Sequence, residues 1–307
     1  MEKPYMIIRR SVYVFLQHYH YFTTIPALLA LPFSALTLLA QAFSPSSPLL
    51  YTIRARLHAI FKAAGFPQSH LLSVLSLKLS QSVLTASYTF PCTMLFLLIA
   101  KAYTIKGLTP QKPVFPSASL AFVSLYTSLL FTYICSAFAI VTANASAFSL
   151  LFLGFSFCEG LRLSSPDWLL AVSSAWAIAY SIISAYVLMI RNLALVISGM
   201  ERSSTGFSAV LEACVLVKGK TSTALLLALP INLLLASVES LFHYRIVKVY
   251  HLADKLTTSM AWESLFIAYL YSILVILNFI VSCIFFKCCK RNFIMDPVGR
   301  DSYLIDI

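Results

Sequence analysis

The amino-acid sequence predicts an all-α, polytopic membrane protein: a transmembrane helical bundle of six spans with interfacial amphipathic helices. Of its 307 residues, 60% are hydrophobic and only 11% are charged, whereas an average soluble domain carries about 25% charged residues. The mean hydropathy is +0.86. The charged residues fall in short clusters separated by long uncharged runs, which is typical of a chain that lies mostly in hydrocarbon.

Each predicted span is an uncharged or nearly uncharged window of sufficient length. A helix needs about 20 apolar residues to cross a hydrocarbon core of roughly 30 Å, because each residue adds about 1.5 Å. Five windows meet this requirement and are predicted as the first, second, fourth, fifth and sixth spans: 21–43, 83–105, 168–190, 221–242 and 264–286.

The third span lies in an uncharged stretch, 113–157, that is too long for a single crossing. As one helix this stretch would extend about 68 Å. We therefore interpret 106–128 as a cytoplasmic loop with an interfacial segment and 129–158 as the span. The alternative is two spans broken at 142–144, which would give seven spans and place the termini on opposite sides of the membrane. We favour six.

The remaining segments connect these spans and indicate their orientation. The Lys and Arg residues number 14 on the side of the two termini and 8 on the other side. Positive flanks are retained in the cytoplasm, so both termini are predicted cytoplasmic. The segments are an N-terminal interfacial helix, a loop with an amphipathic helix, a short loop, an amphipathic linker, a further loop and a tail: 1–20, 44–82, 159–167, 191–220, 243–263 and 287–307.

Three of these segments have the periodicity of amphipathic helices, and we expect them to lie along the membrane surface. The first predicted apolar face holds Ile8, Val12, Phe15, Leu16 and Tyr19. The second helix covers 53–64 and ends at Gly65. The third apolar face holds Phe207, Val210, Leu211, Cys214 and Val217, and Gly219 is placed to cap the end of this helix. Anchoring the ends of the spans is the alternative role for all three.

The formal net charge of +11 indicates anionic membrane lipids rather than nucleic acid as partners. A surface that binds nucleic acid gathers its basic residues in one stripe with aromatic residues between them, whereas these Lys and Arg residues are spread over every loop. Anionic lipid headgroups are the simpler partner. The candidate headgroup contacts are Arg9, Arg10, Lys218 and Lys220.

The sequence carries none of the catalytic motifs for zinc hydrolysis, nucleotide phosphate binding or an activated serine. All six histidines lie outside the predicted spans. No catalytic residue, metal ligand or cofactor is predicted, and an enzyme is not expected.

A charged side chain inside a span is costly and is usually kept for function. Glu239 is the candidate pathway charge, because it follows a long uncharged run. Lys78, Lys101 and Glu263 are weaker candidates. All four lie near predicted helix ends, where such side chains can also reach the headgroups.

Two neighbouring cysteines, Cys288 and Cys289, lie between Lys287 and Lys290 just after the sixth span. This is the juxtamembrane setting in which S-palmitoylation occurs, so both are candidate lipidation sites, with unmodified thiols as the alternative. Most of the seven cysteines lie within spans or at their ends, and no disulfide is predicted.

Several segments share a recognisable pattern. It runs from Asn192 through Glu201 and Gly206 to Leu-Val-Lys-Gly-Lys at 216–220, and further parts are Phe-Leu-Leu-Ile-Ala-Lys-Ala at 96–102 and Phe-Phe-Lys-Cys-Cys-Lys at 285–290. In these segments, and over nearly its whole length, the chain resembles a family of plant six-helix integral membrane proteins of unknown function.

The chain departs from that family's pattern in two places. Ala213 stands where the family usually has a serine, and residues 203–205 stand where a tyrosine commonly precedes the glycine. The resemblance implies the six-helix fold and a plant endomembrane (ER or Golgi) or plasma-membrane setting, and it implies no reaction.

Two function classes are compatible with these features. The preferred one is a structural, trafficking or lipid-interacting membrane component, which accounts for the surface helices and for the few polar residues in the spans. The alternative is a small-solute transporter or channel. Membrane lipids are the predicted partners, and a homo-oligomer or contact with other membrane proteins stays open.

Overall fold

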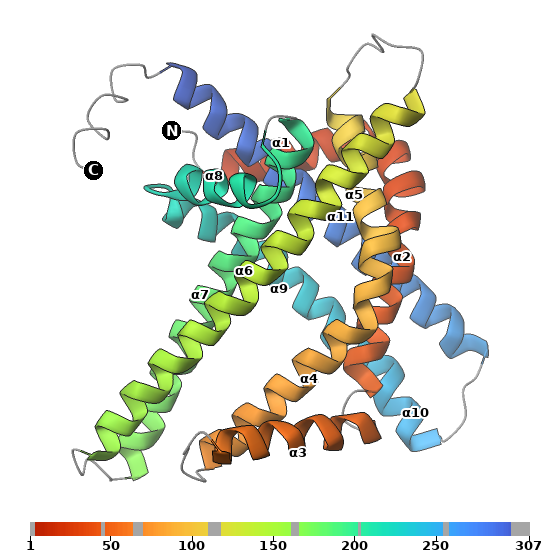
Figure 1. Cartoon of the computed structure of the whole chain (residues 1–307). Helices are drawn as coiled ribbons and strands as arrows, with labels where there is room; N and C mark the ends of the chain where they lie inside the picture. The colour runs from red at the N-terminus through yellow and green to blue at the C-terminus, as the bar shows by residue number, and fades with distance from the viewer. Residues whose placement is uncertain are drawn as a thin grey trace, which may run out of the picture. The chain divides into compact units, whose positions relative to one another are not determined.

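The described residues of the computed structural model are almost all helical, with no strand among them, which confirms the predicted fold class. They are residues 4–43, 47–63, 70–109, 118–160, 166–201, 204–253 and 258–295. The elements labelled in Figure 1 are α1 (Pro4–Gln17), α2 (Tyr19–Phe43), α3 (Pro48–Ala63), α4 (His70–Cys92), α5 (Leu98–Leu108), α6 (Ala118–Gly160), α7 (Pro166–Met200), α8 (Phe207–Val217), α9 (Thr221–Phe242), α10 (Lys248–Ala253) and α11 (Thr258–Met295). Two π-helical turns, η2 (Thr93–Leu97) and η3 (His243–Val247), lie between α4 and α5 and between α9 and α10.

Six helical runs in this part of the chain are long and apolar enough to cross a membrane. They are Tyr19–Ala42, Leu79–Leu108, Ala121–Ala147, Ile178–Met200, Thr221–Tyr250 and Thr258–Lys290. The protein is therefore a multi-pass α-helical membrane protein, as its composition predicts.

The third span is where the structure departs most from the sequence prediction. We expected an interfacial segment up to residue 128 and a span from 129, but α6 is a single helix of 43 residues. It passes through 142–144 without interruption, so the alternative with a break there is also wrong. The physical reason is that α6 holds no proline and no glycine before Gly154. Its Ser and Thr hydroxyls bond carbonyls one turn back, as Ser146 does to Thr142, which leaves the helix intact.

The second and fifth helical runs are longer than predicted, and each contains a π-turn. Pro91 lies inside α4 and removes one N–H from the helical ladder. The wide turn of η2 follows it directly, and the helix then continues to Leu108. In the same way, η3 carries α9 past Phe242 into α10. Part of the predicted loop 243–263 is therefore helix.

The helices predicted at the surface do form, and the side of α1 that packs against protein only partly overlaps its predicted apolar face. Ile7, Ser11 and Phe15 are its buried residues. Val12 and Leu16, two members of the predicted apolar face, are exposed. Periodicity finds apolar side chains, but it does not tell which of them contact protein.

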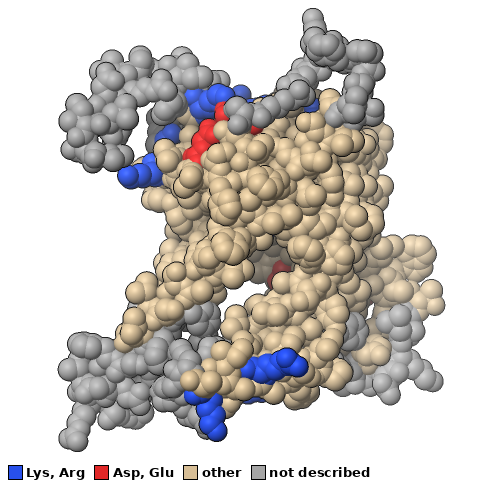
Figure 2. Space-filling model, viewed as in Figure 1, with Lys and Arg blue, Asp and Glu red and all other residues tan. Residues whose placement is uncertain are grey.

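The chain forms two compact units. The first comprises Met1–Gln17, Ile105–Ile231 and Leu277–Ile307, and the second His18–Thr104 and Asn232–Ile276. In the first unit, α6 and α7 run side by side and α8 packs against both. In the second, α2 and α3 pack against α4. Charged side chains occupy small groups, and broad areas over the helices are uncharged (Figure 2).

Candidate functional site

The candidate site of the first unit is built on the short helix α8, which crosses the direction of α6 and α7 (Figure 1). Gly206 precedes it with φ +64° and ψ −128°, a conformation that is essentially restricted to glycine. The backbone N–H of Gly206 donates to Thr132 Oγ1 of α6 at 2.9 Å. A Cβ at this position would lie 2.2 Å from the ring of Phe131. Glycine therefore allows the chain to approach α6 closely where α8 begins.

Three hydroxyl groups extend this contact between α6 and α7. Thr132 Oγ1 donates to Ser198 Oγ at 2.8 Å, and the hydroxyls of Ser198 and Ser128 lie 2.8 Å apart. Thr132 and Ser198 are fully buried. Because these donors and acceptors satisfy one another in an apolar setting, the network fixes the start of α8 on the two long helices.

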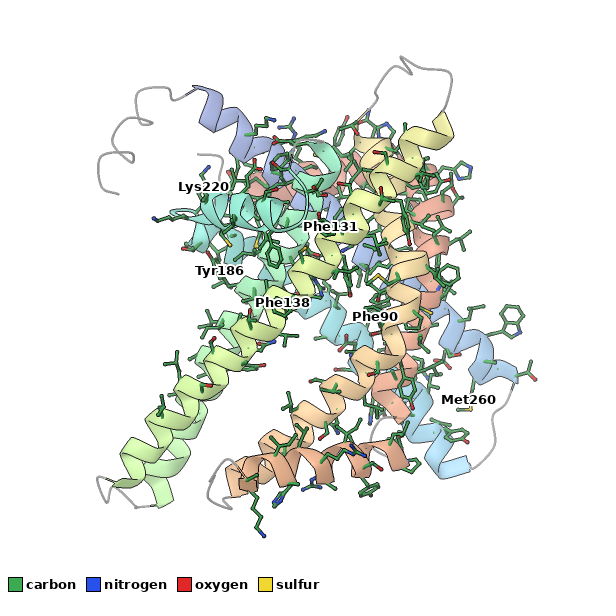
Figure 3. The ribbon with its side chains drawn as sticks, viewed as in Figure 1. Phe90, Phe131, Phe138, Tyr186, Lys220 and Met260 are labelled. Atoms are coloured by element: carbon green, nitrogen blue, oxygen red, sulfur yellow. The ribbon has the colours of Figure 1, made fainter. Side chains whose placement is uncertain are left out.

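The inner face of α8 is made of small and branched apolar residues. Ala209, Ala213 and Val217 are completely buried, and Val210 is nearly so. Alanine side chains let the backbone of α8 approach its neighbours closely. Tyr186 of α7 lies next to Cys214 under the helix (Figure 3). Burial raises the pKa of the Cys214 thiol, so its reactive thiolate form is disfavoured.

The outer face of α8 is equally apolar but exposed. Phe207, Leu211 and Val215 follow one another at four-residue spacing, and 52%, 66% and 70% of their surfaces are accessible. The predicted apolar face of this helix is therefore wrong as a single face, because its members divide between the inner and outer sides. A helix that is apolar on both sides is stable only where both sides have an apolar environment. Protein covers the inner side of α8 and leaves Phe207, Leu211 and Val215 on the outer side exposed.

A basic turn follows the outer face. The N–H of Lys218 donates to the carbonyl of Cys214 at 3.1 Å, and that of Lys220 to the carbonyl of Val217 at 2.8 Å. Gly219 between them has φ +79°, which confirms its predicted place at the helix end. Lys218 is exposed and Lys220 is half-buried. The turn thus places two basic residues directly after the exposed apolar stripe.

The end of α11 lies beside this turn, since the side chain of Lys220 is next to Cys289. Lys290 pairs with Glu201 at the end of α7, and Lys287 Nζ donates to the carbonyl of Leu108 at 2.9 Å. Two lysines of α11 therefore bond its end to the ends of α7 and α5.

Of the two candidate lipidation sites, Cys289 is buried and Cys288 is half-buried. Acylation stays a prediction, and Cys288 is the better placed of the two. Arg9 and Arg10, the other predicted headgroup contacts, are both exposed on α1.

The first unit also holds a cation that the sequence prediction placed outside the span. Since α7 continues to Met200, Arg191 lies within the apolar run Ile178–Met200 rather than after it. Its guanidinium carbon is 5.8 Å from the ring centre of Tyr133 on α6, within range of a cation–π interaction. Its Nε is buried with no hydrogen-bond partner among the described residues.

The candidate pathway charge lies in the second unit. Glu239 accepts a hydrogen bond of 2.9 Å from the hydroxyl of Tyr271 on α11, a partner that sequence reasoning did not identify. Glu263 forms an exposed ion pair of 3.4 Å with Arg245. Lys101 is buried in α5, and the side chain of Lys78 lies outside the described residues. Within the described ranges, no group of three or more His, Cys, Asp or Glu residues could hold a metal ion.

The fold and these sites define a multi-pass helical membrane protein in which many Ser and Thr hydroxyls bond carbonyls of their own helix. The chain belongs to the family described as a domain of unknown function (DUF8558), whose model matches residues 4–296. Neither the curated proteins nor the solved structures contain a match to the chain.

Proposed function

We propose that this protein is a lipid-interacting structural or trafficking component of a membrane, in which α8 lies between the headgroups and the acyl chains. One observation carries the proposal: α8 is held by its inner face and presents Phe207, Leu211 and Val215 outward. Burying a large apolar side chain stabilises by about 1.5–3 kcal/mol. Three such side chains, each already partly covered by protein, would supply at most about three times that amount at a membrane interface.

The basic turn after α8 supports the same placement. Each lysine near an anionic bilayer surface contributes about 1 kcal/mol of attraction, and Lys218 and Lys220 follow the apolar stripe at once. In this proposal both termini and α8 are cytoplasmic, and anionic lipids are the partners. The resemblance to plant six-helix proteins favours an endomembrane or the plasma membrane, and an enzymatic activity is not proposed.

Depth-dependent quenching of fluorescence tests where α8 lies. With the three native tryptophans changed to phenylalanine, Leu211→Trp places an indole on the outer face, and Glu212→Trp places one at the half-buried edge of the helix. In nanodiscs with lipids brominated near the headgroup, we expect strong quenching for Leu211→Trp and at most half of it for Glu212→Trp. Equal, weak quenching in both variants would show that α8 faces water and would refute the proposal.

Retention of anionic lipid through purification tests the basic turn. We expect the double change Lys218→Gln and Lys220→Gln to lower the bound anionic lipid about threefold to tenfold, as measured by mass spectrometry. The matched control, Arg54→Gln with Arg56→Gln on α3, removes the same charge at a helix that we predict on the other side. Equal losses in both variants would mean that net charge alone retains the lipid.

A further inference from the structure

The N-terminal helix α1 is too short to cross a membrane. Its 14 residues extend about 21 Å, whereas a hydrocarbon core is roughly 30 Å thick. It belongs to the first unit, and Figure 1 shows α1 and α8 at the level of the C-terminal end of α7. A helix of this length lies along a surface, and its side chains tell which kind of surface it is.

The protein holds α1 by one side. Ile7, Ser11 and Phe15 occur every four residues and are buried, so they lie along one face of the helix. Ser11 Oγ donates to the carbonyl of Ile7 at 2.7 Å, which satisfies this hydroxyl within the helix. The buried face therefore needs no further partner, and the rest of α1 faces outward.

A stripe of exposed side chains runs along the outward side. Tyr5, Arg9, Val12 and Leu16 follow one another at steps of four, three and four residues, which places them in one row on an α-helix. The exposed fractions of Tyr5, Val12 and Leu16 are 57%, 38% and 59%. Large side chains with apolar surface are costly to keep in water, so this row indicates an apolar environment.

Arg9 lies within this stripe and is exposed, although the sequence prediction placed it away from the apolar face. Tyr5 lies one turn before it and Tyr13, which is 65% exposed, one turn after it. A guanidinium next to apolar side chains suits a bilayer surface, because its long stem can reach the phosphates and its nitrogens can bond them in pairs. Tyrosine is enriched at the same level of a membrane, since its ring is apolar and its hydroxyl is polar.

The charge of α1 favours anionic lipid over a second copy of the chain. Arg9 and Arg10 are the only charged residues of the helix, and both are exposed. A second copy that met this face across a two-fold axis would bring the same arginines together, and like charges repel. An anionic bilayer instead strengthens binding about fivefold for each basic residue near its surface.

We propose that the outward stripe of α1 lies on an anionic bilayer surface. In this arrangement Tyr5, Val12 and Leu16 face the acyl chains, and Arg9 bonds a lipid phosphate. The inference rests on the proposed function for the choice of a membrane as partner, and it adds a second lipid contact to that of α8. The two helices carry separate contacts, so each can be tested alone.

Quenching by brominated lipids tests where α1 lies in the full chain in nanodiscs. With the three native tryptophans changed to phenylalanine, Leu16→Trp places an indole on the stripe. The matched control, Gln17→Trp, places one about 100° around the helix. With lipids brominated near the headgroup, we expect quenching of Leu16→Trp to be roughly twofold stronger than that of Gln17→Trp, or more. Equal quenching would overturn the placement, and so would weak quenching of Leu16→Trp, which is the result expected if a second copy covered the stripe.

Selective bromination tests the headgroup. In mixed nanodiscs of phosphatidylcholine and phosphatidylserine, either lipid is brominated in turn, and the two quenching values of Leu16→Trp give the preference for phosphatidylserine beside α1. We expect a preference of about fivefold, falling to about twofold or less in Arg9→Gln. The control Arg10→Gln removes the same charge outside the stripe and should retain more of the preference. No preference with Arg9 present, or equal losses in the two variants, would overturn the assignment to Arg9.

The probe on α8 separates this inference from the proposed function. If Leu211→Trp is quenched strongly and Leu16→Trp is not, α8 keeps its place at the membrane and only the inference about α1 fails. If neither is quenched, the proposed function itself fails. Quenching of Leu211→Trp should also be unchanged in Arg9→Gln, which shows that the variant remains folded.

Discussion

Each of the two units has a charged residue within an apolar helical run and a tyrosine beside it. One tyrosine contacts the charged group with its ring, and the other contacts it with its hydroxyl. In the first unit, Arg191 lies over the ring of Tyr133. In the second, Glu239 accepts a hydrogen bond from the hydroxyl of Tyr271. The face of an aromatic ring is negative and attracts a cation, whereas a phenolic O–H can donate only to an acceptor.

The two contacts therefore differ in the hydrogen bonds that they leave to Arg191 and to Glu239. The ring face attracts the whole guanidinium group but accepts no ordinary hydrogen bond, and the Arg191 Nε has no partner in the described part of the chain. The Tyr271 hydroxyl satisfies one oxygen of Glu239. One contact is therefore the attraction of a cation by a neutral ring, and the other is a hydrogen bond to a carboxylate.

The largest effect that we expect concerns the close packing of Gly206 against α6 in the first unit. Gly206→Ala forces a side chain into a backbone conformation that alanine avoids and against the ring of Phe131. We expect a loss of about 2–4 kcal/mol in unfolding free energy. The measurement is the thermal unfolding of the full chain in detergent.

Gly219→Ala is the matched control for that change. Gly219 also has a positive φ, of +79°, but a Cβ there would meet nothing within 4 Å. We expect a loss of about 1 kcal/mol, from conformation alone. Equal losses at the two glycines would show that the approach of Gly206 to α6 contributes nothing, and the first unit would then lack the tight contact described above.

The number of spans could be predicted from the sequence because it depends on local properties. An apolar window of sufficient length specifies a crossing wherever it occurs in the chain, and six helical runs of this kind are present. Gly219 could be predicted for the same reason, since a helix end needs only its own backbone. The boundaries could not be predicted in this way, because η3 continues α9 past the predicted end at residue 242 and α6 begins well before the predicted start at residue 129.

The pairings within the sites could not be read from the sequence, because they join residues far apart in the chain. Periodicity marked Phe207 and Val217 as one face of α8, yet Val217 is completely buried whereas 52% of the surface of Phe207 is exposed. The charge of Glu239 was visible in the sequence, whereas Tyr271 is one of 16 tyrosines. A glycine before an apolar helix was the one available signal for the contact of Gly206 with Thr132.

The smallest expected effects compare the two tyrosines directly. Tyr133→Phe keeps the ring over Arg191 and should change the unfolding free energy by less than about 0.5 kcal/mol. Tyr271→Phe removes the donor to Glu239 and should cost about 1–2 kcal/mol. Thermal unfolding of both variants at low salt measures the contrast.

Arg191→Gln supplies the control for the first unit, since it removes the cation and keeps a polar side chain. If the ring attracts the charge, Tyr133→Leu should destabilise the native chain more than it destabilises the Arg191→Gln chain, by about 0.5–2 kcal/mol. A coupling of zero would mean that the ring only packs against α7. A loss in Tyr133→Phe as large as that in Tyr271→Phe would assign the same role to both hydroxyls and remove the distinction between the two units.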